Sequence, residues 1–160
     1  MQQWKVFFVK PRTEKKVAEF CALYGINHYM PLREKRRVAQ RRTIIARVPV
    51  FPGYVFAKID EPQRLQMLKT NLLVRVLEPL KPRRMLRDLI MVRRALRVNP
   101  ALKTVRPLEK GCPVRIVSGP FKGVEGVVAR MSGTLKVILN VEMIGQAVAV
   151  TAGMEQVATL

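Results

Sequence analysis

The chain has 160 residues, of which 49% are hydrophobic, so it can form one domain or two small ones with packed cores. It carries 30 Lys and Arg residues against 11 Asp and Glu residues, which gives a formal charge of +19. The hydrophobic content excludes a disordered chain, and the charge predicts a polyanionic partner, most often nucleic acid.

Several other classes of protein are excluded by what the sequence lacks. No apolar run is long enough to span a bilayer, and the short polar start is unlike a signal peptide. Cys21, Cys112 and the single histidine, His28, provide neither a disulfide framework nor a metal site. A nucleophile–base pair and a carboxylate cluster are also missing, so we expect no enzyme. The sequence predicts a reduced, cytoplasmic protein without metal, cofactor or membrane contact.

The charge is unevenly distributed along the chain. Residues 1–103 hold 24 basic and 7 acidic side chains, a net charge of +17. Residues 104–160 hold 6 basic and 4 acidic side chains, a net charge of +2. The two parts are therefore expected to face different partners.

The first hundred residues alternate between strand and helix patterns. Residues 3–9 are rich in β-formers, with Trp4, Val6 and Phe8 on one face. A helix follows, for which Thr13 is the expected cap and Gly25 the expected end. Its buried stripe is formed by Val17, Phe20, Cys21 and Tyr24. Residues 27–32 are predicted as a second strand.

Residues 33–47 hold seven cations and only one acid, Glu34. We interpret them as a projecting β-hairpin or a mobile arm. A solvated basic loop is one explanation and a nucleic-acid contact is the other. The contact is favoured, because so many like charges repel one another without an anion.

The segment Phe51-Pro52-Gly53-Tyr54-Val55-Phe56 concentrates aromatic residues around a turn. Pro52 and Gly53 predict the turn, and the following alternation predicts a strand. Residue types alone favour a core strand, whereas a surface for a partner is the alternative.

The remaining elements complete an α+β chain. A short helix starts at Asp60-Glu61-Pro62, a strand covers residues 73–78 and a long helix covers residues 83–98. An antiparallel sheet with helices on one face suits this order. We expect domains at residues 1–100 and 110–160, joined by a linker over residues 101–109. The second domain has five short predicted strands, with a turn at Ser132-Gly133, and suits a small SH3-like barrel.

These residues resemble the NusG/Spt5 family of transcription elongation factors. The N-terminal part resembles the NusG N-terminal domain through Trp4, the basic hairpin and the segment at residues 51–56. Residues 110–128 and 140–150 resemble the two halves of a KOW domain. The resemblance covers nearly the whole chain, in family order.

The resemblance implies a binding protein that docks on the clamp helices of the RNA polymerase β′ subunit and suppresses pausing or termination. The positions implied for this contact are Phe8, Phe51, Tyr54 and Phe56. It also implies that Lys10 contacts non-template DNA, and the charge pattern adds further candidates for DNA or nascent RNA. These candidates are Arg12, Lys15, Lys16, Arg36, Arg37, Arg41 and Arg42.

In the KOW domain, the resemblance implies that Met143 and Ile144 contact a small-subunit ribosomal protein or the termination factor Rho. The high charge and the arginine-rich last helix favour a specialised, RfaH-like paralogue. Because Val, Ile and turn glycines recur over residues 114–150, we predict a β-barrel without a fold switch, in a monomer. The alternative is a general RNA-binding or ribosome-associated KOW protein, which should carry its basic excess on the barrel.

Overall fold

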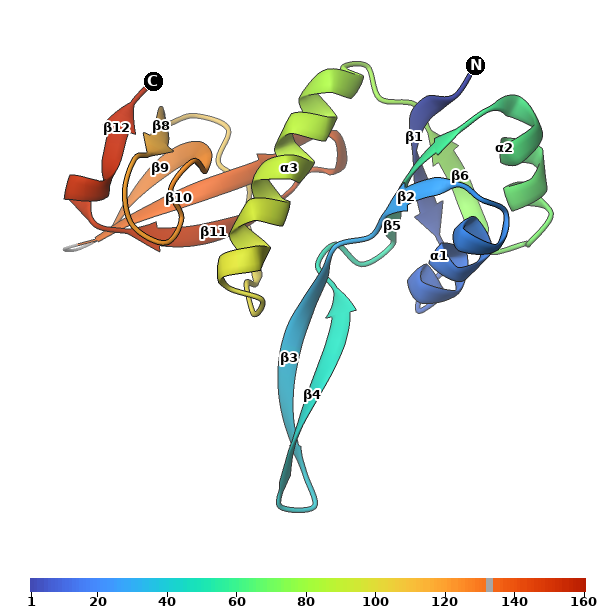
Figure 1. The fold of residues 1–160 in the computed structure, drawn as a ribbon, viewed down its shortest axis with the longest axis horizontal. Coiled ribbons are helices and arrows are strands. Elements are labelled where there is room, and N and C mark those ends of the chain that lie inside the picture. The colour runs from blue at the N-terminus through green and yellow to red at the C-terminus, as the bar shows by residue number, and fades with distance from the viewer. Residues whose placement is uncertain (132–133) are drawn as a thin grey trace. The chain divides into compact units, whose positions relative to one another are not determined.

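The computed structural model describes residues 1–131 and 134–160 of the chain, which form two compact units (Figure 1). The units comprise residues 1–31 with 49–82, and residues 32–48 with 83–160. Each unit contains an antiparallel sheet, and helices accompany the first, so the predicted α+β class is confirmed. The turn predicted at Ser132 and Gly133 lies outside the described residues.

The first unit is a four-stranded antiparallel sheet covered on one face by two helices. Its strands are β1 (Gln3–Val9), β2 (Asn27–Tyr29), β5 (Tyr54–Ile59) and β6 (Leu73–Leu77), in the order β2-β5-β1-β6. The helices are α1 (Glu14–Leu23) and α2 (Glu61–Leu68). Phe7 of β1, Cys21 of α1, Val55 of β5 and Met67 of α2 are fully buried in one core, which fixes the covered face.

The ends of these helices follow the expected signals, with one correction. Gly25 has φ +67° just after α1, and Asp60 begins α2 with a complete capping box. In this box the Gln63 N–H donates to Asp60 Oδ1 at 2.9 Å, and the Asp60 N–H donates to Gln63 Oε1 at 3.0 Å. Thr13 precedes α1, but its side chain does not cap the helix, because its hydroxyl donates to the Lys10 carbonyl instead.

The second unit combines a β-ribbon, a long helix and a six-stranded sheet. The ribbon consists of β3 (Leu32–Ala39) and β4 (Arg42–Pro49), and the helix is α3 (Pro82–Val98). The sheet order is β12-β8-β9-β10-β11-β7, and every pair with a described register is antiparallel. Its elements are β7 (Thr104–Val105), β8 (Cys112–Ile116), β9 (Glu125–Met131), β10 (Thr134–Val141), β11 (Gln146–Ala152) and β12 (Val157–Thr159). Two short 3-10 turns, η1 (Glu142–Ile144) and η2 (Met154–Gln156), precede β11 and β12.

The segment predicted as a linker contributes to this sheet. β7 pairs with β11, and Leu102 is 5% exposed. The Leu108 N–H and carbonyl both bond the side-chain amide of Asn140, at 3.0 and 2.8 Å. These contacts order residues 102–108 against the sheet, although the predicted domain boundaries themselves stay a prediction.

Candidate functional site

The turn at Phe51–Tyr54 requires the glycine in its centre. Gly53 has φ +93°, a backbone conformation that other residues rarely adopt. A Cβ atom on Gly53 would also lie 3.2 Å from Cε1 of Phe8. Conformation and space therefore both select glycine, and the turn brings β5 close to the Phe8 ring.

A buried carboxylate holds this turn in place. Glu14, in the first turn of α1, is 7% exposed and accepts a hydrogen bond from the Gly53 N–H at 3.0 Å. The Val9 N–H donates to the Gly53 carbonyl at 2.9 Å, so α1 and β1 both fix Gly53. Nothing in the sequence pattern singled out Glu14. An acid in a first helical turn is usually explained by the helix dipole, so its contact with a residue 39 positions away gave no sequence signal.

The pairing of β1 with β5 places aromatic rings side by side on the face opposite α1 and α2. Phe8 pairs with Tyr54, and their stacked rings lie 5.4 Å apart at 29°. Both side chains are half-buried and keep accessible surface. Phe51 and Phe56, also predicted for this site, are only 1% and 0% exposed. A partner docking on this arrangement therefore meets the Phe8–Tyr54 pair first.

The cations that follow β1 lie in the turn between β1 and α1 and on the first turns of α1. The exposed members are Lys10, Arg12, Lys15 and Lys16. The Thr13 hydroxyl donates to the Lys10 carbonyl at 2.6 Å, and the Lys10 N–H donates to the Leu72 carbonyl at 2.9 Å. The backbone of this turn is thus ordered, while its charged groups face solvent, and Lys10 lies two residues after Phe8.

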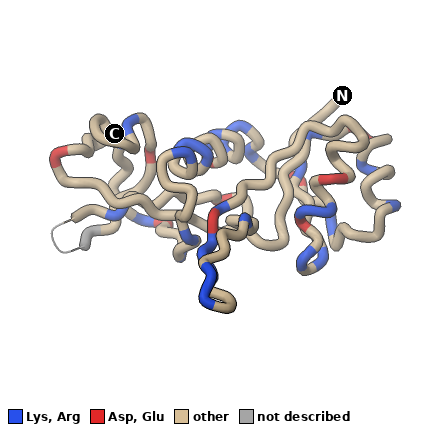
Figure 2. The backbone as a smooth tube through the Cα atoms, turned by 60° about the horizontal axis from the view of Figure 1, so that its bottom comes forward, with Lys and Arg blue, Asp and Glu red and all other residues tan. Residues whose placement is uncertain are grey.

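The basic hairpin predicted at residues 33–47 is present as the β3–β4 ribbon. Figure 2 shows its Lys and Arg residues along both strands and the connecting turn. Arg36, Arg37, Arg41 and Arg42 are all exposed. Within the part of the chain that the structure describes, no ion pair involves a hairpin cation. The positive charge of the hairpin is therefore not neutralised within the described residues, and an anionic partner would neutralise it.

The predicted partner residues of the C-terminal sheet lie on η1. Met143 and Ile144 are half-buried, and Gly145 ends the turn with φ +61°. Helix α3, in the same unit, contacts the first residue of this turn. Arg84 Nε lies 2.8 Å from Glu142 Oε2, and the Glu142 N–H donates to Asp88 Oδ2 at 3.4 Å.

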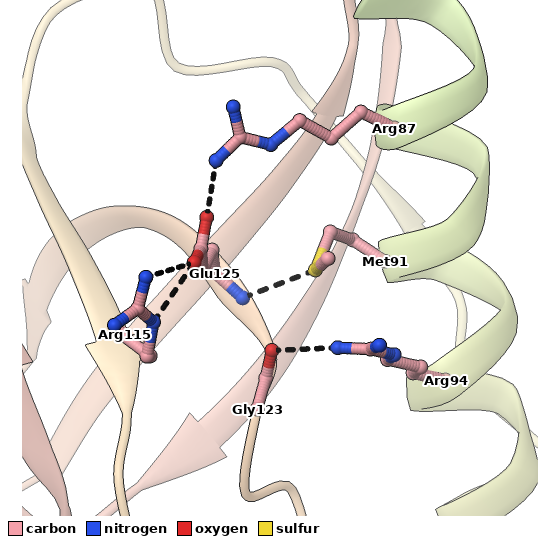
Figure 3. A network of polar contacts seen from close by, with 6 residues as sticks. All are labelled: Arg87, Met91, Arg94, Arg115, Gly123 and Glu125. Carbon is pink, nitrogen blue, oxygen red and sulfur yellow. Dashed lines mark hydrogen bonds and ion pairs between the residues drawn. The ribbon is translucent and has the colours of Figure 1, made fainter.

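A second set of contacts fixes α3 beside β8 and β9, as Figure 3 shows. Glu125 accepts from Arg87 at 2.8 Å and from Arg115 at 2.8 and 2.6 Å. Its N–H donates to the sulfur of Met91 at 3.3 Å, and Arg94 donates to the Gly123 carbonyl at 3.2 Å. Hydrogen bonds from Arg115 and Arg87 hold the pKa of Glu125 below its usual range. Part of the arginine content of α3 is therefore used to dock the helix on this sheet.

Asp88, which accepts a hydrogen bond from Glu142 where α3 contacts η1, has a raised pKa. Burial raises its pKa from 3.8 to about 6, although the Glu142 N–H and the Arg84 guanidinium both favour the charged form. Burial also raises the pKa of the Cys21 thiol to about 12, which leaves no reactive thiolate. Among the described residues, no group of three or more His, Cys, Asp or Glu side chains could hold a metal ion.

Comparison with known protein families identifies the N-terminal part of the chain. Residues 2–105, more than half of the chain, match the NusG family, described as transcription termination factor nusG. The chain belongs to the NusG family. A comparison with curated protein sequences finds no match.

Membership of the NusG family identifies the kind of protein that this chain is. This chain is a transcription factor rather than an enzyme, and RNA polymerase binding is implied. The matched residues include the Phe51–Phe56 segment, the basic ribbon and α3. Within the described residues, no helix is long and apolar enough to cross a membrane.

The Glu14–Gly53 hydrogen bond gives a first prediction. Glu14→Ala leaves the Gly53 N–H without its acceptor, so we expect the free energy of unfolding of the first unit to fall by about 1–3 kcal/mol. Glu14→Gln keeps an acceptor oxygen and should cost less than about 1 kcal/mol. The measurement is urea unfolding followed by the fluorescence of Trp4, the only tryptophan. Equal losses in the two variants would show that the hydrogen bond does not hold the turn.

The raised pKa of Asp88 gives a second prediction. Because the folded-state pKa of about 6 exceeds the ordinary 3.8, the folded protein retains a proton that the unfolded chain has lost. Stability should therefore fall as the pH rises through this window. We expect Asp88→Asn to raise the free energy of unfolding at pH 8 by about 1 kcal/mol, a value reduced for solvent screening of a half-buried group.

At pH 3 the Asp88→Asn variant and the parent protein should be equally stable, since the parent carboxyl is then largely protonated in both states. Chemical unfolding of both proteins at the two pH values provides the comparison. An advantage of the variant that is the same at pH 3 and pH 8 would rule out titration of Asp88 as its cause.

Proposed function

We propose that this protein is a transcription elongation or antitermination factor that binds RNA polymerase through the aromatic face of β1 and β5. The observation that carries this proposal is the stacked Phe8–Tyr54 pair, which keeps accessible surface at a turn fixed by Gly53 and Glu14. A rigid, half-exposed aromatic pair supplies binding energy at little conformational cost.

The polymerase element proposed as the partner is the pair of β′ clamp helices. Phe8 and Tyr54 would make the contact. Phe51 and Phe56, also predicted for it, are 1% and 0% exposed and would lie beneath the surface that the partner meets. Helices present apolar side chains at regular spacing, which suits a contact with the Phe8–Tyr54 pair. The bound protein would suppress pausing or termination.

Two basic surfaces are proposed to contact nucleic acid in the elongation complex, either non-template DNA or nascent RNA. The first follows β1 and contains Lys10, Arg12, Lys15 and Lys16. The second is the β3–β4 ribbon, with Arg36, Arg37, Arg41 and Arg42. Both surfaces are exposed, and the ribbon cations lack internal ion pairs within the described segments.

The C-terminal sheet is proposed to act as a KOW domain that recruits a small-subunit ribosomal protein or Rho through Met143 and Ile144. Both side chains keep accessible surface on η1. The low charge of residues 104–160, +2, suits an apolar protein contact better than general RNA binding. The charge of +19 for the whole chain supports a specialised, RfaH-like role rather than a housekeeping one.

Tyr54→Ala in the full chain tests the polymerase contact. Removing a central aromatic anchor should weaken binding to core RNA polymerase by about 2 kcal/mol, roughly 30-fold. Binding is measured by biolayer interferometry with immobilised protein, and circular dichroism checks the fold of each variant.

Tyr24→Ala is the matched control. Tyr24 is also half-buried and stacks on a phenylalanine, Phe20, with ring centroids 5.9 Å apart, but it lies in α1. Its loss should leave polymerase binding within about twofold. Equal weakening by both substitutions would contradict a specific contact through Tyr54. Binding of RNA without binding of polymerase would favour the general RNA-binding alternative.

A further inference from the structure

The β3–β4 ribbon has two chemically different faces, and its turn determines which residues share each face. Gln40 and Arg41 connect the strands with φ +50° and +63°, the two positive values that define a type I′ turn. Such a two-residue turn places Ala39 directly opposite Arg42. Residues then alternate between the faces along each strand.

On one face of the ribbon all charged side chains are basic. Arg33, Lys35 and Arg37 of β3 share it with Arg42 of β4, and it contains no acid. The opposite face carries two cations, Arg36 and Arg47, together with the acid Glu34. The side chains of Lys35, Arg37 and Arg42 are exposed, and Arg33 is half-buried at the base.

We propose that the ribbon binds duplex DNA with its basic face, formed by Arg33, Lys35, Arg37 and Arg42. This inference deepens the proposed nucleic-acid contact of the hairpin and rests on it, but not on polymerase binding. It specifies the face, the residues that share it and the form of the nucleic acid. It also narrows the ribbon surface proposed above, because Arg36, named there, lies on the face that is not expected to contact DNA.

The spacing of the cations suits a phosphate backbone. Alternate residues of a strand lie about 6.7 Å apart, and phosphates of one DNA strand are spaced about 3.4 Å along the helix axis. Because the backbone also winds around the duplex, neighbouring phosphates lie farther apart than this axial rise, and the spacing of Arg33, Lys35 and Arg37 is comparable with the distance between them. A ribbon that lies along a duplex can keep all three contacts at once.

The composition of the ribbon favours a duplex over a single strand. Residues 32–49 contain no aromatic side chain, so they offer no platform on which unpaired bases could stack. The major groove of B-form DNA admits a two-stranded ribbon, whereas the A-form major groove of duplex RNA is too deep and narrow for side chains to read. These two facts together select duplex DNA.

The test compares two double variants of the full chain that remove equal charge from opposite faces. Lys35→Gln with Arg37→Gln alters the basic face, and Arg36→Gln with Arg47→Gln alters the other. Each lowers the formal charge from +19 to +17, so a general charge effect is the same in both. Binding of a fluorescent, mixed-sequence DNA duplex is followed by anisotropy between about 50 and 200 mM KCl.

We expect the basic-face variant to bind duplex DNA on the order of tenfold more weakly and the opposite-face variant to stay within about twofold of the parent protein. The slope of log K against log salt should fall by about 1.8 only in the basic-face variant, because two phosphate contacts are lost. Duplex RNA and single-stranded DNA of the same sequence should bind more weakly than duplex DNA.

Equal losses in both variants, no loss in either, or equally tight binding of duplex RNA would overturn the inference. The assay contains no polymerase, so its outcome is independent of the Tyr54→Ala experiment. Loss of polymerase binding in Tyr54→Ala without a difference between the ribbon faces would remove this inference and leave the proposed function intact. A difference between the ribbon faces without any loss of polymerase binding in Tyr54→Ala would keep this inference and remove the proposed polymerase contact.

Discussion

The hydrogen bond from the Gly53 N–H to the buried Glu14 carboxylate is the constraint on which the aromatic face depends. It ties the turn before β5 to the first turn of α1, while the Gly53 carbonyl is held by β1. With the turn fixed, the β1–β5 register places Phe8 against Tyr54. The rings are then presented by backbone that is anchored on two sides, so a partner need not order them on binding.

Charge divides the chain into surfaces with different roles. Cations after β1 and on the β3–β4 ribbon face solvent, whereas Arg84, Arg87 and Arg94 of α3 are used to dock the helix near η1 and β9. Composition alone could not separate these two groups of arginines. The sequence does not show whether an arginine pairs with an acid such as Glu125 or stays exposed to bind an anionic partner. The acids that α3 meets, Glu125 and Glu142, lie more than thirty positions away.

Elements with local signals were predictable, and those that depend on distant contacts were not. The start of α2 at Asp60, the β3–β4 ribbon and helix α3 follow from residues close in sequence. Burial of Glu14, pairing of β7 with β11 and docking of α3 depend on contacts between distant segments, so no periodicity could reveal them. The prediction that the Thr13 side chain caps α1 was wrong, because its hydroxyl donates a hydrogen bond to the Lys10 carbonyl instead. The family follows from residues 2–105.

The central claim is that the aromatic face of β1 and β5 binds RNA polymerase, and site-specific photocrosslinking tests it most directly. A photoreactive phenylalanine analogue would replace Tyr54 in the full chain, and the same analogue at Tyr24 would serve as the control. We expect position 54 alone to crosslink to the β′ subunit within purified core polymerase. Absence of a polymerase crosslink from position 54, or an equal yield from position 24, would contradict the claim.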